Sequence, residues 1–254
     1  MSVHYTDVMG RYGNQLFPYL VGRILSHHLK FKFFNHTINH PDFILQDIEE
    51  DEENNNYTSY DTPVQLINSI EQPNLNIFDL INDNTPRKIA LYGYFQKKQL
   101  VLPFKDFIKK IYKYKKIIIN KNDLAVHIRS GDLYIPSLTN NLLPTEYYEH
   151  AIESTPHENI TVCTDDPSMP ISAHIIKKYN CKVYSGNERD AIIFLSSHNN
   201  LILSQGTFSF WAGFFCDGDN IINAIPKTGW NSRENIKDID LLIQDKNYKY
   251  IELT

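Results

Sequence analysis

The segment DLAVHIRSGDLY, residues 123–134, places Arg129 between an apolar run and a turn. The run before the arginine is typical of a buried strand, and the Ser-Gly-Asp after it is typical of a turn. A guanidinium stays charged when partly buried, and its planar fork of donors matches a phosphate group. Two interpretations follow: Arg129 binds an anion, or it pairs with Asp132 and stiffens the turn.

Three more segments carry polar groups just after predicted strands: CTDDPS at 163–168, SG at 185–186 and SQGTFSFW at 204–211. In a doubly wound sheet, ligands bind outside the carboxyl ends of the strands, so these segments are expected to converge there. Thr207, Phe208 and Ser209 begin a predicted helix, whose hydroxyl and N–H groups can bind an anion. Ordinary helix capping is the alternative.

Other polar side chains near these ends also have two interpretations each. Asp190 opens a predicted helix, where it either complements the helix dipole or accepts paired N–H bonds from a guanine edge. Of the adjacent Asp165 and Asp166, at most one could hold a metal easily, because neighbours on an extended segment point to opposite faces. Capping or hydrogen bonding is therefore favoured for them. His127 shares the strand face of Arg129, but a lone strand histidine is more often structural.

Strands and helices alternate regularly in the second half of the chain. The predicted strands are DLAVHIR, NITVCTDD, CKVYSG, NLILSQ and NIINAIPK, and the last of these closes the series. The predicted helices are PTEYYEHAIES, SMPISAHIIKKY, ERDAIIFLSSH and TFSFWAGFF. This alternation predicts the α/β fold class, with a parallel sheet of Rossmann type.

The first half opens with a glycine loop and a helix in MGRYGNQLFPYLVGRILSHHL. Asn14 is predicted to cap this helix, with Pro18 in the first turn, where a missing N–H is tolerated. Strands are predicted at residues 31–35 and 88–94, and a further helix is predicted in PFKDFIKKIYKY.

The predicted organisation is an N-terminal half at 1–118, a C-terminal half at 119–235 and a last segment at 236–254, with a hinge near 114–122. Residues 46–62 are acidic and rich in Asn, which is typical of a solvated loop. A surface insertion is favoured there over an acidic binding site.

The composition excludes several classes of function. A formal net charge of −5 gives no polycationic surface, so nucleic-acid binding is not expected. No run reaches the roughly 18 apolar residues of a transmembrane segment, and the N-terminus lacks the pattern of a secretory signal. Three cysteines without CxxC spacing favour a reducing compartment and argue against a structural zinc. A cytoplasmic location, in a bacterium or a virus-infected cell, is expected.

Seven segments follow one another in a familiar order: GRYGNQLF, YGYFQ, HIRSGDL, LPTEYY, TDDPS, DAIIFLSSHNNLILSQGTFSFW and PKTGW. Together they resemble the α1,2-fucosyltransferases of glycosyltransferase family 11, in which a GNQLFQY loop, an HxRRGD turn and an SxFSWW segment recur. The resemblance runs from about Met9 to Trp230. TDDPS is also similar to the core α1,6 fucosyltransferases, and MGRYGNQ to the protein O-fucosyltransferases.

The resemblance implies a GT-B fold, with two Rossmann-like halves facing across a cleft. It also implies GDP-fucose as the donor substrate, a glycan acceptor, no metal and no other cofactor. By position, Arg129 resembles the arginine that binds the donor pyrophosphate, and His127 and Asp190 resemble contacts to guanosine. The implied catalytic residues are Arg129 and Asn14, and the implied donor-binding residues are His127, Arg129, Asp132, Asp166, Asp190, Thr207, Phe208, Ser209, Gly13 and Asn14.

Two positions depart from the family pattern. Ser130 stands where a second arginine is usual, and Phe210 replaces a tryptophan, which leaves the linkage and the acceptor open. The family reaction inverts the anomeric centre, and the expected acceptor is the 2-OH of galactose. Asp7 and Asp132 are candidates for the base that takes the acceptor proton, and Asn14 is a candidate for orienting the hydroxyl.

The sequence is also compatible with other functions. A GT-B transferase could use a different nucleotide sugar, in which case another nucleotide would bind better than GDP. A non-catalytic relative would bind a nucleotide or glycan without turnover. A purely structural protein would leave the clustering of polar groups at strand ends unexplained.

Overall fold

The computed structural model describes residues 1–5, 10–36, 63–72, 74–83, 85–113, 115–234 and 239–253. The chain divides into two compact units, Met1–Lys113 and Tyr114–Thr254. The predicted acidic loop at 46–62 and Asp7 lie outside the described residues. The predicted boundaries at 118/119 and 235/236 stay predictions.

The C-terminal unit is built on a six-stranded, all-parallel sheet with the order β10-β9-β8-β5-β6-β7. In chain order, β5 is the first strand of this sheet. The next two strands, β6 and β7, lie on one side of β5, and β8, β9 and β10 lie on the other side. The direction of winding therefore reverses between β5 and β8, which makes their carboxyl ends the topological switch point. The strands are β5 (Leu124–Ile128), β6 (Ile160–Thr164), β7 (Lys182–Val183), β8 (Asn200–Ile202), β9 (Asn220–Ile225) and β10 (Tyr248–Glu252).

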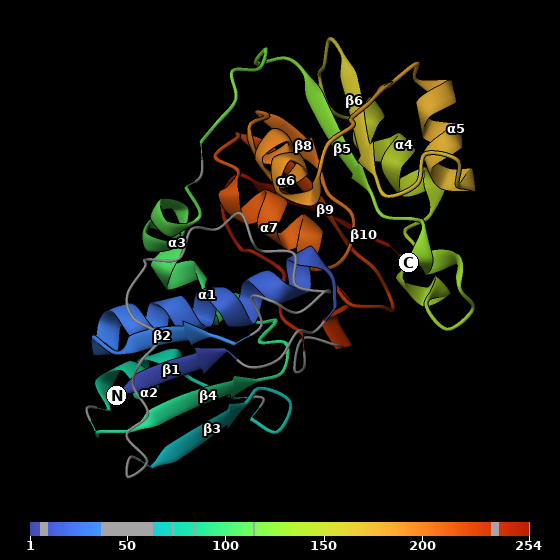
Figure 1. Cartoon of the computed structure of the whole chain (residues 1–254). Helices are drawn as coiled ribbons and strands as arrows, with labels where there is room; N and C mark the ends of the chain where they lie inside the picture. Colours follow the sequence, from blue (N-terminus) through green and yellow to red (C-terminus); the bar gives the residue numbers. More distant parts are fainter. Residues whose placement is uncertain are drawn as a thin grey trace. The chain divides into compact units, whose positions relative to one another are not determined.

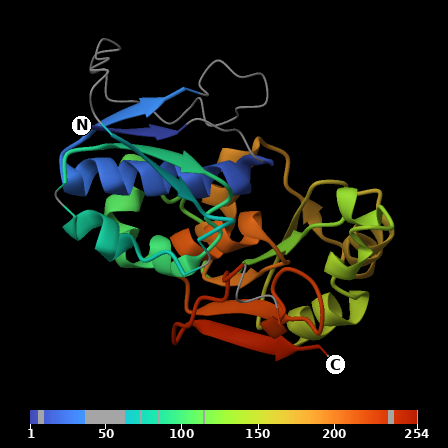
Figure 2. The same ribbon diagram turned by 90° about the horizontal axis from the view of Figure 1, so that it is seen from below.

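Helices connect these strands as the sequence predicts, and the α/β class is confirmed. The helices are α4 (Thr145–Glu153), α5 (Pro170–Lys178), α6 (Glu188–Ser196) and α7 (Thr207–Phe215), with single 3-10 turns η3 (Asp132–Tyr134) and η4 (Thr139–Asn141) after β5. The expectation that residues 220–227 close the series is wrong, because β10 pairs in parallel with β9. Figure 2 shows these two strands side by side, with the C-terminus at the end of β10. The YKYIE sequence of β10 lacks a continuous apolar run because it is an edge strand and only partly buried.

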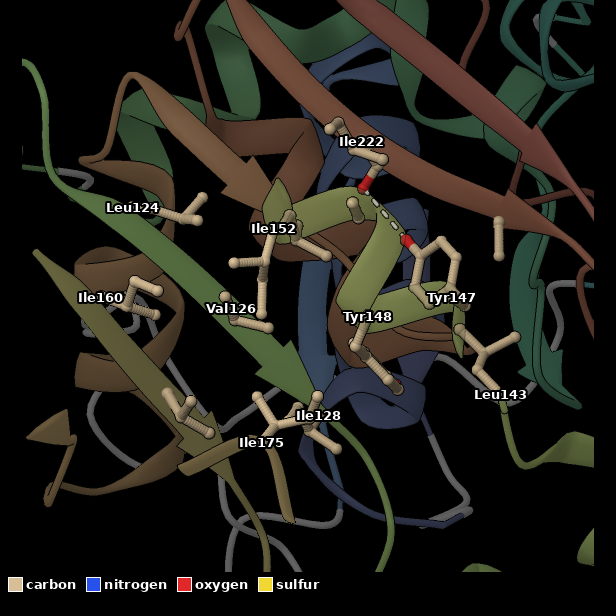
Figure 3. Packing of buried hydrophobic residues seen from close by; sticks show 14 residues of the cluster. Leu124, Val126, Ile128, Leu143, Tyr147, Tyr148, Ile152, Ile160, Ile175 and Ile222 are labelled. Atoms are coloured by element: carbon tan, nitrogen blue, oxygen red, sulfur yellow. Dashed lines mark hydrogen bonds between the residues drawn. The ribbon is translucent and has the colours of Figure 1, made fainter. Parts of the chain in front are cut away.

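The core beside β5 fixes the ends of the central strands (Figure 3). Val126 and Ile128 of β5 pack with Ile152 of α4 and Ile175 of α5, and all four are fully buried. Tyr147 of α4 is also buried, and its hydroxyl donates to the carbonyl of Leu203 at 2.7 Å and to that of Ile222 at 3.5 Å. A buried tyrosine hydroxyl needs such partners, so these bonds tie α4 to the end of β8 and to the middle of β9.

The N-terminal unit carries a second parallel sheet, with the order β2-β1-β4-β3 (Figure 1). The apolar face of α1 packs on this sheet, with Leu16, Leu20 and Ile24 fully buried. The elements are β1 (Ser2–Tyr5), α1 (Tyr12–Leu29), β2 (Lys32–Asn35), β3 (Val64–Asn68), α2 (Ile77–Asn82), β4 (Lys88–Tyr92), the 3-10 turns η1 (Lys98–Leu100) and η2 (Leu102–Phe104), and α3 (Lys105–Ile111).

The start of α1 differs from the sequence expectation. The N-cap is Arg11, whose backbone is extended, and not Asn14. The backbone N–H of Asn14 already donates to the carbonyl of Arg11 at 2.8 Å, so Asn14 lies inside the first turn. Pro18 consequently falls in the second turn of the helix and not in the first.

A hydrogen-bonded histidine pair joins β1 to the residue that follows β2. Nδ1 of His4 lies 2.7 Å from Nε2 of His36, and Nε2 of His4 lies 2.6 Å from the hydroxyl of Ser2. Partial burial lowers the pKa of His4 to about 4, with smaller contributions from His36, Lys88 and the N-terminal amine. A proton on His4 is therefore unfavourable in the folded unit.

We expect this pair to make stability depend on pH. The unfolded His4 takes up a proton near pH 6.5 and the folded one near pH 4, so stability is complete above about pH 6.5 and falls as the pH is lowered towards 4. The loss at about pH 5 has an upper limit of about 2 kcal/mol, reduced by solvent screening. Urea unfolding at about pH 7 and pH 5 should show a smaller loss for His4→Gln than for the wild type or His174→Gln. Equal losses in all three proteins would contradict this origin.

Candidate functional site

The candidate site of the C-terminal unit lies at the switch point between β5 and β8. Arg129 directly follows β5, and the loop 203–206 leads from β8 into α7. α7 has no acidic residue in its first turn, and its N-cap, Gly206, has a φ of +90°. The first N–H groups of a helix have no partner within it, so this end of α7 adds partial positive charge near Arg129.

Arg129 is largely buried, and its guanidinium is held on several sides. Nη2 donates to Oδ2 of Asp132 at 3.1 Å, and Cζ lies 4.7 Å from the ring centroid of Trp230. The structural pair with Asp132 is thus present, but it occupies only one of the five N–H donors of the group. Nε is buried and has no hydrogen-bond partner among the described residues. A donor of a largely buried cation that has no partner in the protein is available to an anion.

The turn after Arg129 is fixed by Asp165, which follows β6. Its Oδ1 accepts the backbone N–H of Ser130 at 2.9 Å and that of Gly131 at 3.0 Å. A carboxylate bound by two successive N–H groups holds the backbone more firmly than a neutral acceptor would. Asp165 therefore sets the direction in which the chain leaves β5. The TDDPS motif contains this aspartate, but the residue types alone do not distinguish it from Asp166.

Ser130, the position of the missing second arginine, faces the interior. Its side chain is fully buried, and its hydroxyl lies 2.8 Å from that of Ser172 and 3.5 Å from that of Thr164. The hydroxyls of Ser172 and Thr164 are also 3.0 Å apart. These three small residues join the ends of β5 and β6 to α5, and an arginine would not fit among them without displacing the chain.

His127 and Ser209 bond to each other inside the unit. Nδ1 of His127 lies 2.6 Å from the hydroxyl of Ser209, which also accepts the backbone N–H of Ser204 at 3.0 Å. We assign the ring proton to Nε2, since the Ser209 hydroxyl accepts from Ser204 and can donate its own proton to Nδ1. Both side chains are buried and tie β5 to the start of α7. The predicted donor contacts of His127 and Ser209 stay predictions.

The other predicted residues of α7 lie in its first turn. Thr207 is buried, and Phe208 is partly exposed, with its ring centroid 5.0 Å from that of His127. Phe210, which replaces a family tryptophan, is buried and packs edge-on against Trp211. Phe208 is therefore the aromatic residue that this turn presents towards solvent.

Asp166 and Asp190 both bond to their own loops. Oδ1 of Asp166 accepts from the backbone and hydroxyl of Ser168 at 2.8 and 2.6 Å, which caps the turn before α5. Asp190 is exposed in the first turn of α6, and its Oδ2 accepts from Nδ2 of Asn187 at 2.9 Å. Asn187 in turn accepts the backbone N–H of Asp190 at 2.8 Å. Asp190 is thus held in one orientation on the carboxyl edge, two strands away from Arg129.

Gly13 and Asn14 belong to the N-terminal unit, at the start of α1. Oδ1 of Asn14 accepts from Nε2 of Gln96 at 2.9 Å, which joins the GRYGNQ segment to the YGYFQ segment after β4. Gly10, with a φ of +67°, allows this approach, since a Cβ there would overlap the side chain of Asn14. The two motifs therefore meet at the switch point of the first sheet, between β1 and β4.

The described residues contain no group of three or more His, Cys, Asp or Glu side chains that could hold a metal ion. None of their helices has the length and apolar character needed to cross a bilayer.

A sequence model of glycosyl transferase family 11 matches residues 83–252, about two thirds of the chain. The chain belongs to this family. The resemblance inferred from the ordered motifs is confirmed, although the N-terminal GRYGNQLF motif lies outside the matched range. Family 11 membership covers the whole switch-point region, from Arg129 to Trp230.

Individual relatives of this family 11 chain are distant. The O-antigen biosynthesis glycosyltransferase WbnK of Escherichia coli is 24% identical over 184 residues, which are 61% of this chain and 61% of WbnK. The match thus spans less than two thirds of that relative. Crystal structures of POFUT1 with GDP-fucose and with GDP are each 11% identical, with TM-scores of 0.45 and 0.44, over 85% of this chain and 95% and 94% of theirs.

Two residues of the site escaped sequence reasoning: Asp165 as the anchor of the turn, and Trp230 as the ring beside Arg129. The signal for both was present in the TDDPS and PKTGW motifs. Neither motif says which segment its residues contact, because those contacts join positions far apart in the sequence.

The two adjacent aspartates offer a matched test of the turn. Asp165→Ala removes the acceptor of two N–H groups and should lower the free energy of unfolding by about 1–3 kcal/mol. Asp166→Ala removes only a turn cap and should cost no more than about 1 kcal/mol. Chemical denaturation of both variants measures the difference. A larger loss for Asp166→Ala would show that Asp165 does not anchor the turn.

Proposed function

We propose that this chain is an inverting glycosyltransferase that moves L-fucose from GDP-fucose to a glycan hydroxyl, the 2-OH of galactose. The observation that carries the proposal is the largely buried, incompletely bonded guanidinium of Arg129 at the switch point of a Rossmann-type sheet. Family 11 membership and the ordered fucosyltransferase motifs support the choice of donor.

Breaking the bond between fucose and GDP leaves negative charge on the pyrophosphate. Arg129 supplies a permanent positive charge, and the first turn of α7 supplies backbone N–H groups directed at the same place. Both groups are fixed before the reaction, so they stabilise the leaving group without reorganising. No metal is part of the proposed step, in which Arg129 and these N–H groups supply the positive charge.

The guanine base is assigned to Asp190. Neighbouring strands lie about 4.8 Å apart, so the ends of β5 and β7 are separated by roughly 10 Å, about the reach of a nucleoside diphosphate. Asn187 holds Oδ2 of the Asp190 carboxylate, which orients it to accept the paired N–H groups of guanine. Phe208, the partly exposed aromatic residue of α7, adds an apolar surface beside the donor.

The acceptor side of the reaction rests on fewer groups. Asp132 is engaged by Arg129, so we assign it to holding the guanidinium and not to proton transfer. Asn14 carries an amide, which cannot take up the acceptor proton but can orient the hydroxyl through hydrogen bonds. Gln96 fixes the direction of that amide by donating to its Oδ1.

Calorimetric titration with GDP in buffer containing EDTA tests the donor site. We expect GDP to bind and UDP, CMP and ADP to bind far more weakly. Arg129→Ala should weaken GDP binding at least about tenfold and lower kcat with GDP-fucose by about 10²–10³-fold, because a charge-stabilising donor is lost. Arg233→Ala, which removes an exposed arginine paired with Glu252, is the matched control and should bind GDP as the wild type does.

The outcomes separate the alternatives. A preference for UDP, or a strict need for a divalent metal, would contradict GDP-fucose as the donor and favour another nucleotide sugar. GDP binding without turnover on galactose-terminated acceptors would favour a non-catalytic relative. Full turnover by Arg129→Ala would refute the mechanism.

Asp190 can be tested by removing one group from the base. Inosine diphosphate lacks the 2-amino group of guanine, so the wild type should bind GDP about 10-fold or more tightly than inosine diphosphate. Asp190→Asn keeps the shape of the side chain but loses the paired acceptor. Its affinities for GDP and inosine diphosphate should therefore differ by no more than about threefold. Glu188→Gln, in the same helical turn, should keep the wild-type preference. If Asp190→Asn also keeps it, Asp190 does not contact the base.

A further inference from the structure

Three separated segments meet at the guanidinium of Arg129. Cζ of Arg129 lies 4.7 Å from the ring centroid of Trp230, which belongs to the loop after β9. A Cβ placed on Gly206, in the loop after β8, would lie 3.2 Å from Nη1 of Arg129 and 3.3 Å from Cε3 of Trp230. Glycine at this position therefore lets the loop, the indole and the guanidinium come into contact.

A buried amide network holds the loop of Trp230 in place. Gln205 is fully buried; its Nε2 donates to the carbonyl of Asn141 at 3.0 Å, and its Oε1 accepts the backbone N–H of Asn231 at 3.1 Å. The backbone N–H of Trp230 donates to Oδ1 of Asn141 at 3.0 Å. Both N–H groups that flank the indole are thus bonded to buried side-chain acceptors, and breaking either bond would leave a buried group unsatisfied.

Gly229 shows how tightly this loop is fitted. Its φ is +98°, a region that other residues rarely adopt. A Cβ there would lie 2.8 Å from the carbonyl of Asn140 and 2.9 Å from Oε1 of Gln205. The position of Trp230 is consequently set by buried backbone and amide contacts, and it does not depend on the guanidinium that the indole covers.

We propose that Trp230 is a positioning residue for Arg129. The fixed indole supports the guanidinium by a cation–π contact, while Asp132 holds Nη2. The group is thereby kept in one orientation, with its remaining N–H groups directed to the pyrophosphate at the start of α7. This inference rests on the proposed donor site, and it adds that the affinity of the site depends on an aromatic residue that does not bind the donor itself.

Two substitutions at Trp230 test the proposal. Trp230→Leu removes the ring and should weaken GDP binding about 10-fold, since a partly desolvated cation–π contact is lost. Trp230→Phe keeps a smaller ring and should weaken binding only about two- to threefold. The matched control is Tyr179→Leu, which removes the partly buried ring beside Lys178 at the C-terminal end of α5 and should leave GDP affinity unchanged.

A double-substitution cycle separates positioning from a general structural effect. Arg129→Lys keeps the charge but lacks the planar group that stacks on the indole. Adding Trp230→Leu to Arg129→Lys should therefore change GDP affinity by less than about twofold, whereas the same change in the wild type costs about 10-fold. Equal losses in both backgrounds would overturn the proposal, because Trp230 would then act independently of Arg129.

Three other outcomes of these binding measurements would also decide between the positioning role and the proposed function. A folded Trp230→Leu protein with wild-type GDP affinity would overturn the positioning role while leaving the donor site intact. If Trp230→Leu does not fold, Trp230→Phe carries the test, and unchanged affinity in that variant would likewise overturn the role. Failure of the wild type to bind GDP would instead refute the proposed function, from which this inference follows.

Discussion

The permanent positive charge of Arg129 organises the C-terminal unit. It lies at the point where the parallel sheet reverses its direction of winding. Arg129 sits there because β5 is laid down first and flanked on both sides by later strands, so that its carboxyl end opens onto the switch point. A buried guanidinium must be compensated, and the protein compensates it only in part, through Asp132 and the ring of Trp230. Nε of Arg129 is buried and has no hydrogen-bond partner among the described residues, so this donor is available to an anion.

Most of the polar side chains around this charge support the backbone. Asp165 binds the turn after β5, the His127–Ser209 pair joins β5 to α7, and Asp166 caps the loop before α5. The polar atoms of these side chains are bonded within the protein. Each bond fixes the position of a residue of the site. The arrangement matches the chemistry of phosphate binding at a helix N-terminus, where the backbone supplies donors and side chains determine where that backbone lies.

The serine at position 130, where the family usually has a second arginine, has a structural role. Its buried hydroxyl joins those of Thr164 and Ser172, so the side chain serves the contact between β6 and α5. A single arginine then carries the charge of this turn. The support of that arginine by Trp230 and by the amide network of Gln205 accordingly matters more here than in a site with two adjacent cations.

The sequence by itself determined the alternation of strands and helices from β5 to β9, the α/β class and the placement of Arg129 at a strand end, because apolar periodicity and turn residues act locally. It did not reveal β10, whose edge position permits a polar sequence, or the true start of α1, where Arg11 is the cap. Only the tertiary structure decided which aspartate anchors the turn, which way Ser130 faces and which ring covers Arg129. Those contacts join residues up to about a hundred positions apart, and such pairings depend on strand order and packing that no local pattern encodes.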